Sequence, residues 1–241
     1  MTISQNIPWT RLAVEAAAIV ASILLAFAID AWWADREIDR WQSAQLRALR
    51  DEFSVNLQAL NVIVQSNDSA ARHLESFITR VRDANDMNQV TVSDAALVAL
   101  INWRTSDIST GTLDALLSSG KLAQISNSDI RQALAAWPSV VGDAQEDENL
   151  ARDYVENVLV QSLLGQGILE LAYRSRPLPG AVRIDAQIET ESVLSVSPVL
   201  IEMATIRIVH SRMASASISQ LREKIKYILQ LIDADLEKAQ K

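Results

Sequence analysis

Residues 12–34 read LAVEAAAIVASILLAFAIDAWWA, and Ala16 to Ile29 within them carry no charged side chain. As a helix rising about 1.5 Å per residue, Leu12 to Ile29 spans roughly 27 Å, close to the roughly 30 Å hydrocarbon core of a bilayer. Amphipathic aromatic side chains favour both membrane interfaces. The sequence therefore predicts one transmembrane helix over residues 12–34, with tryptophans as its interface anchors. These anchors are Trp9, Trp32 and Trp33.

Two other interpretations of this run remain open. Ala26-Phe27-Ala28 matches the small-x-small pattern of a signal-peptide cleavage site. Against cleavage, Arg11 is the one basic side chain before the run, Glu15 interrupts its start, and apolar residues continue to Trp33. A buried helix of a soluble protein would leave the flanking tryptophans unexplained. A retained anchor fits the residues better than either alternative.

The anchor has one small and polar face. At 100° per residue its small and polar residues fall on neighbouring positions around the helix. They are Glu15, Ala18, Ser22 and Ala26, with Asp30 at the edge of the face. Because small residues let helix backbones approach closely, and ionisable groups in hydrocarbon usually face protein or water, we expect this face to contact another membrane helix. In the competing interpretation the two carboxylates simply lie near the headgroups and alanine serves as a good helix former.

The basic residues around the anchor give mixed indications of its orientation. Arg11 precedes the run, and four arginines follow it: Arg36, Arg40, Arg47 and Arg50. By the positive-inside tendency this places the C-terminal part in the cytoplasm, but acidic residues stand among the nearest arginines, and long C-terminal domains translocate despite such charges. We expect a single-pass protein of a bacterial inner (cytoplasmic) membrane, with its soluble domain in the periplasm.

Composition favours helices throughout the remaining chain. Its 241 residues include only 6 Gly and 5 Pro, with 49% apolar and 22% charged residues. We predict an all-α fold in which the N-terminal transmembrane helix continues into a soluble antiparallel helical bundle. The predicted divisions are a tail (1–11), the transmembrane helix (12–34) and a soluble domain (35–241) with an irregular segment near 174–197. The net charge of −8 argues against a nucleic-acid partner, and the lack of cysteine excludes disulfides and thiolate metal sites.

Local signals place the helices of the soluble domain. Apolar residues from Leu46 to Val64 recur at helical spacing, and whether that helix continues through His73 to Val81 is open. Ser93 is a candidate cap, Gly120 suits a left-handed helix end, and Pro138 is expected to stop or kink its helix. Further expected elements are a helix beginning near Thr110, one capped by Ser126 or Ser128, a long helix from Val140 to Tyr173, and a final helix from Pro198 to Leu236.

The central sequence SDISTGTLDALLSSGKLAQISNSDIRQALAAW, residues 106–137, resembles the signature of an uncharacterised family of bacterial single-pass membrane proteins. Members of that family pair a membrane helix of the type E-x(n)-LLAF-x-I-x-x-W with a helical domain of unknown function. Glu15 with LLAFAIDAWW at 24–33, and YILQLIDADLEK at 227–238, are similar to its other elements. The resemblance implies membrane attachment and a helical architecture, and it transfers no catalytic residue.

No residue pattern specifies a reaction. His73 and His210 are the only histidines, and neither lies in a catalytic motif. Gly165 and Gly167 lack the preceding strand of a phosphate-binding loop, and the acidic run from Asp143 to Glu148 is typical of a solvated helix start. We therefore expect no catalytic residue, cofactor or metal.

The leading functional prediction is a non-catalytic, membrane-anchored interaction or scaffolding protein. Its expected partners are the lipid bilayer and either a second copy of the chain or another membrane protein. The alternatives are a ligand-binding, sensor-like helical domain acting through a partner and, third, a membrane-tethered enzyme.

Overall fold

The computed structural model describes residues 9–175 and 191–239. Side chains are described from residue 13 onward, with the exception of Ser175. Its dominant element is a single helix, α1 (Trp9–Asp83), of 75 residues. No Gly or Pro occurs between these two residues, so nothing in the sequence breaks the helix. The question left open by the sequence is thus answered: the stripe from Leu46 to Val64 and the later stretch through His73 belong to one helix.

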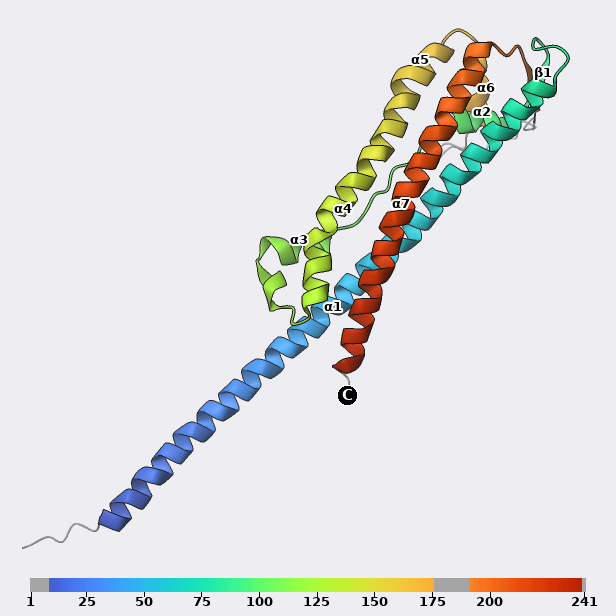
Figure 1. The fold of residues 1–241 in the computed structure, drawn as a ribbon. Helices are drawn as coiled ribbons and strands as arrows, with labels where there is room; N and C mark the ends of the chain where they lie inside the picture. Colours follow the sequence, from blue (N-terminus) through green and yellow to red (C-terminus); the bar gives the residue numbers. More distant parts are fainter. Residues whose placement is uncertain (1–8, 176–190, 240–241) are drawn as a thin grey trace, which may run out of the picture.

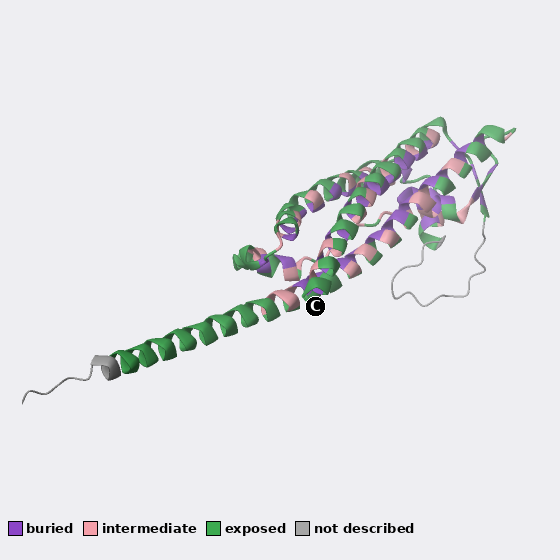
Figure 2. Ribbon diagram, turned by 60° about the horizontal axis from the view of Figure 1, so that its bottom comes forward, coloured by how far each residue is buried: buried purple, intermediate pink, exposed green. Residues whose placement is uncertain are grey.

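The first half of α1 projects from the rest of the molecule (Figures 1 and 2). All side chains of residues 13–40 are exposed, and the first buried side chain is that of Leu46. From there to Val81, apolar residues of α1 line the core of the helical bundle. The helix therefore joins a bare N-terminal segment to a packed C-terminal segment without an intervening loop.

Two further long elements complete the bundle. α4 (Ser128–Asp153) continues through a π-helical turn, η2 (Tyr154–Leu159), into α5 (Val160–Leu163). The last helix, α7 (Pro198–Lys238), returns along α1 and α4, so the C-terminal end lies beside α1 near the start of the bundle (Figure 1). α7 runs antiparallel to α1, whereas α4 runs in the same direction as α1. The predicted antiparallel arrangement therefore holds for α7 and not for α4.

A small sheet lies at the end of the bundle remote from the N-terminus. β1 (Val90–Ser93) pairs with β2 (Glu191–Leu194) in antiparallel register, with Val90 opposite Leu194. Val90 and Val92 are buried and Thr91 is exposed, the alternation expected of a half-buried strand. The chain is thus mostly helical rather than all-α, and β2 lies inside the segment predicted to be irregular. Residues 176–190 of that segment lie outside the described residues.

Short helices connect α1 to α4. Ser93 caps α2 (Asp94–Ile101) by accepting a hydrogen bond from the amide of Ala96, which confirms the predicted cap. α3 (Gly111–Ser118) begins after Thr110 as predicted, and Gly120 has a φ of 68° at its end. A 3₁₀ turn, η1 (Lys121–Gln124), follows.

Three local predictions were wrong in whole or in part. The cap of α4 is Asn127, whose side chain accepts from two main-chain amides, rather than either neighbouring serine. Of the two outcomes predicted at Pro138, the stop is wrong, because α4 continues past it for 15 residues to Asp153, and the kink stays a prediction. The expected helix from Val140 to Tyr173 is interrupted at Gly165 and Gly167, both with positive φ, before α6 (Ile168–Ser175).

The buried apolar residues form two separate cores. The proximal core, nearer to the projecting segment, joins α1 from Leu46 to Val64 with α3, α4 and the C-terminal half of α7. The distal core joins α1 from Ala71 to Val81 with both strands, α2, α6 and the first turns of α7. Buried polar side chains, which we call the polar belt, lie between the two cores. The polar belt consists of Asn67, Glu148, Arg207, Ser211 and Ser215.

Candidate functional site

The projecting segment of α1 carries the residues that the sequence singled out. Glu15, Ala18, Ser22, Ala26 and Asp30 are all exposed. The hydroxyl of Ser22 donates a 2.8 Å hydrogen bond to the carbonyl of Ala18, so its polarity is satisfied within the helix. These residues share one face by helical geometry, and nothing else in the described chain covers that face.

Large apolar side chains cover most of this segment, and one of them, Ile19, lies on the same face as Glu15 and Ser22. Leu24 is 63% exposed and Phe27 is 67% exposed. By length and composition the segment is apolar enough to cross a membrane. Its most apolar stretch is nowhere buried against the rest of the described chain. A helix of a soluble core passes the same test of composition but is mostly buried, which this segment is not.

The aromatic residues at the end of the apolar run form a compact group. The rings of Trp32 and Trp33 lie 5.5 Å apart in an edge-to-face arrangement. The guanidinium of Arg36 lies 5.5 Å from the ring centre of Trp32, within the range of a cation–π contact. Trp9 lies in the first turn of α1, and its side chain is outside the described residues.

A second candidate site is the polar belt around Arg207. Only 1% of this residue is exposed, yet no carboxylate pairs with it within the described ranges. Its guanidinium donates 2.7 Å hydrogen bonds to the hydroxyl of Ser211 and to the main-chain carbonyl of Asn102. Burial lowers the pKa of Arg207 to about 10. Arg207 is therefore a buried cation stabilised by neutral acceptors.

Tyr154 and His210 flank this arginine. Their rings stack with centres 5.0 Å apart, and the hydroxyl of Tyr154 donates to the carbonyl of Met203. Burial raises the pKa of Tyr154, whereas burial and the nearby Arg207 lower the pKa of His210. The half-buried His210 thus favours its neutral form. His73, in contrast, lies exposed on α1.

The acidic run of α4 is not wholly solvated, contrary to expectation. Glu148 is buried, and its Oε2 accepts hydrogen bonds from the amide and the hydroxyl of Ser106, at 3.0 and 2.8 Å. Burial raises the pKa of the Glu148 carboxyl despite these two donors. Asp147 accepts a hydrogen bond from the hydroxyl of Ser217. Asp143 and Glu146 remain exposed.

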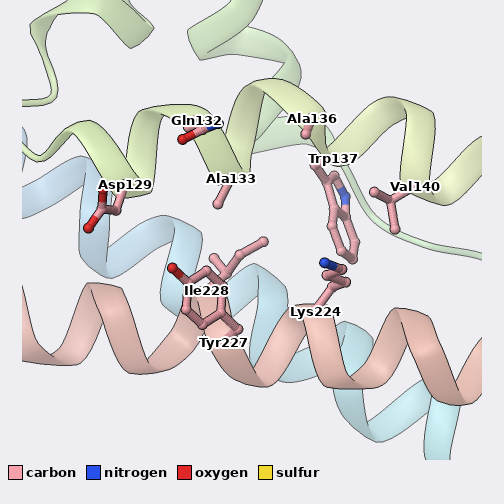
Figure 3. A pocket seen from close by; sticks show the side chains of 9 residues that line it. All are labelled: Asp129, Gln132, Ala133, Ala136, Trp137, Val140, Lys224, Tyr227 and Ile228. Atoms are coloured by element: carbon pink, nitrogen blue, oxygen red, sulfur yellow. The ribbon is translucent and has the colours of Figure 1, made fainter.

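A groove between α4 and α7 is the third candidate (Figure 3). It has a volume of about 250 Å³, and Trp137 and Ile228 give it an apolar lining. Trp137 packs edge-to-face against Phe53 at 4.8 Å and is itself buried. Polar side chains also line the groove. They are Asp129, Gln132, Lys224 and Tyr227.

The described residues bring together no cluster of three or more histidine, cysteine, aspartate or glutamate side chains that could hold a metal ion. Glu148 is the one buried carboxylate in these parts of the chain, so no buried acid–base carboxylate pair is formed there. Sequence reasoning missed Arg207 and Glu148. Glu148 belongs to a run of acidic residues that is typical of a solvated surface, whereas Arg207 falls among the buried positions of α7.

Searches for similar proteins give no further assignment. No family model, no curated protein and no solved structure matches this chain. The resemblance of residues 106–137 to an uncharacterised membrane-protein family therefore stays a prediction.

Proposed function

We propose that this chain is a membrane-anchored, non-catalytic interaction or scaffolding protein. Residues 12–34 cross the bilayer, and the helical bundle stands in water on one side. The bundle presents its surfaces to partners at a distance from the membrane that is set by the length of α1.

One observation carries the proposal: residues 13–40 of α1 are exposed throughout, and they include the apolar run. Leaving one large apolar side chain in water rather than burying it forfeits about 1.5–3 kcal/mol. A run of this length has no counterpart on ordinary soluble surfaces, because large contiguous apolar patches mark interaction or membrane sites. Lipid tails supply the missing cover without any rearrangement of the bundle.

The continuity of α1 adds a mechanical consequence. The helix passes without a break from Ala34 through the exposed, charged turn at 35–40 into the proximal core. A helical connection is stiffer than a Gly- or Ser-rich linker. The bundle is therefore held at a fixed distance and rotation relative to the anchor, as suits a protein that positions a partner.

The test of anchoring uses the absence of cysteine from the chain, which makes single-cysteine labelling free of background. We expect wild-type protein to stay in membranes through alkaline carbonate extraction. In Thr2→Cys and Ala135→Cys variants, an impermeant maleimide should reach the two positions from opposite sides, with Ala135→Cys labelled from the periplasmic side. Release by carbonate, or a mature chain shortened near Ala28, would contradict the proposal.

Assembly through the anchor is tested separately. We expect Glu15→Leu and Ala18→Leu to reduce the size of the complex captured by crosslinking in native membranes, because leucine blocks close approach at the small face. Ala17→Leu is the matched control, since it makes the same change about 100° around the helix. If complexes of all three variants keep the wild-type size, assembly through the small and polar face is contradicted. Membrane attachment is not affected by that result.

A ligand-binding, sensor-like role is the second candidate, and the groove of Figure 3 favours it. Ala136 lines the groove and is exposed, so Ala136→Leu should fill it without disturbing the core. A ligand that raises the melting temperature of the wild-type protein should lose this effect with Ala136→Leu and keep it with Ala135→Leu. Equal effects in both variants would place the ligand elsewhere.

A further inference from the structure

A second and larger cavity lies where the bundle meets the projecting segment. Its volume is about 540 Å³. One wall is α1 just beyond the apolar run, and the opposite wall is the last turn of α7 (Figure 1). This position is the part of the bundle nearest to the proposed membrane surface.

Basic side chains dominate the lining. Arg36, Arg40, Arg47 and Lys238 line the cavity together with two carboxylates, Asp39 and Asp235. None of the four basic residues forms an ion pair within the described parts of the chain. The whole chain carries a net charge of −8, whereas basic side chains outnumber acidic ones in the lining of this cavity. An anion is the complementary ligand.

The three arginines form a line along α1. At 100° per residue, positions 36, 40 and 47 fall within about 40° of one another. Arg36 follows Trp33 by three residues, which is a rise of about 5 Å, and Arg40 lies about 6 Å further. The headgroup region extends roughly 5–7 Å beyond the hydrocarbon core on each side. With Trp33 at the interface, the long side chains of Arg36 and Arg40 therefore reach the depth of lipid phosphates, whereas Arg47, a rise of about 21 Å beyond Trp33, lines the end of the cavity farther from the membrane.

Two hydrogen-bond acceptors of the lining, Gln42 and Asp235, are already held in place. Asp235 accepts from the amide of Gln42 at 3.3 Å and from that of Asn127 at 3.1 Å. The side-chain carbonyl of Gln42 accepts from the amide of Ser126 at 2.9 Å. A carboxylate beside a set of cations suits a ligand that combines a phosphate with hydroxyl groups, because the hydroxyls can donate to the carboxylate.

We propose that this cavity binds the headgroup of an anionic glycerophospholipid that bears hydroxyl groups, of which phosphatidylglycerol is the simplest. Arg36, Arg40 and Lys238 contact the phosphate, and Asp39 and Asp235 accept hydrogen bonds from the headgroup hydroxyls. The inference rests on the proposed membrane anchoring, which brings the cavity to headgroup depth. The bound lipid fixes the bundle against the membrane surface.

The test uses full-length protein in nanodiscs that contain phosphatidylcholine alone or mixed with phosphatidylglycerol or phosphatidic acid. Native mass spectrometry then counts the lipids that remain on the released protein. We expect phosphatidylglycerol to be retained in preference to both other lipids. The variant Arg36→Gln/Arg40→Gln/Lys238→Gln should lower its retention by about tenfold or more. All three residues are exposed, so the bundle should keep its helical content.

A matched variant removes the same charge elsewhere. Arg72→Gln/Arg82→Gln/Arg104→Gln changes three exposed basic residues of the remote part of the bundle and should leave lipid retention unchanged. An equal loss in both variants would overturn the site, because net charge alone would then explain retention. Equal retention of phosphatidic acid would overturn the role of the hydroxyls. Displacement of phosphatidylglycerol by 10 mM inorganic phosphate would identify a site for a soluble anion instead.

Failure of this inference is distinguishable from failure of the anchoring proposal. Insertion is read in the nanodiscs of phosphatidylcholine alone, where no anionic lipid is present. Protein that inserts there but shows no lipid preference contradicts only the headgroup site. Protein that does not insert contradicts the anchoring and, with it, the headgroup site.

Discussion

The main-chain carbonyl of Asn102 accepts a 2.7 Å hydrogen bond from Nη2 of Arg207, which lies 105 residues further along the chain. Asn102 is the C-terminal cap of α2, so the guanidinium lies at the negative end of that helix. This position explains how a buried cation persists without a carboxylate partner. The contact also attaches α2 to α7 in the polar belt, between the two apolar cores.

Replacing Arg207 by residues of different size separates the effects of its charge and its volume. Its pKa of about 10 implies a burial cost of about 3 kcal/mol for the charged form at neutral pH. Arg207→Met removes that cost and keeps the volume, so its free energy of unfolding should stay within about 1 kcal/mol of wild type. Arg207→Ala leaves a cavity and should lose about 2–4 kcal/mol. Urea unfolding of the full chain in detergent measures both.

Comparing Arg207→Met with Arg207→Ala shows whether the hydrogen bonds of Arg207 contribute to stability. If Arg207→Met loses as much stability as Arg207→Ala, the hydrogen bonds to Asn102 and Ser211 stabilise the fold more than the charge destabilises it.

The titration of His210 should respond to the same substitution. Burial and Arg207 lower the pKa of this imidazole, so its proton NMR midpoint should lie below 6.5. Because the folded state favours neutral His210, its contribution to stability declines as pH falls through 6.5 toward the lowered pKa. In Arg207→Met the pKa should rise toward its ordinary value. Arg212→Gln removes a charge two residues away on the exposed surface and should not shift the midpoint; an equal shift would show that the effect is one of net charge.

Glu148 should make the protein less stable at neutral pH than at mildly acidic pH. Burial raises its folded-state pKa above 4.5, so its contribution is most favourable below pH 4.5 and is lost as pH rises through the raised value. Glu148→Gln keeps an acceptor for Ser106 and should gain about 1–2 kcal/mol at pH 7.5, with the gain vanishing near pH 4.5. Denaturant unfolding at both pH values measures this difference. Glu146→Gln, at an exposed position, should show no such pH-dependent gain, and a pH-independent effect of Glu148→Gln would contradict the assignment.

The elements that sequence reasoning placed correctly are those that rest on local chemistry. The spacing of apolar residues from Leu46 onward defined the buried stripe of α1, and Ser93 and Gly120 marked helix ends through side-chain capping and positive φ. Each of these signals acts within a few residues. They needed no knowledge of what packs nearby.

The elements that were missed depend on contacts between distant segments. β1 is stabilised by pairing with β2, about a hundred residues away, and a four-residue strand carries little signal of its own. The N-terminal amide of α3 at Thr112 is bonded by Glu52 of α1, which no local pattern reveals. Arg207 was detectable in principle. It lies in the line of buried positions of α7 between Ala204 and Ser211, where a charged residue signals a buried polar contact.

Pro138 shows why a strong local signal failed, and its substitution tests the explanation. Proline in a helix interior lacks the amide that would bond to the carbonyl of Leu134, and it costs about 3 kcal/mol relative to alanine. The ring of Pro138 lies on the exposed face of α4, whereas its neighbour Trp137 is buried against Phe53. Tertiary packing of that tryptophan therefore holds the helix together across the proline.

Pro138→Ala should raise the free energy of unfolding by about 1–3 kcal/mol, because it restores the missing hydrogen bond without touching the core. Ser139→Ala is the matched control at the next exposed position and should change stability by about 0.5 kcal/mol or less. Thermal or urea unfolding followed by Trp fluorescence reports both the stability and the environment of Trp137. A loss of stability in Pro138→Ala would contradict this explanation, because it would mean that the proline itself is required to seat Trp137 on Phe53.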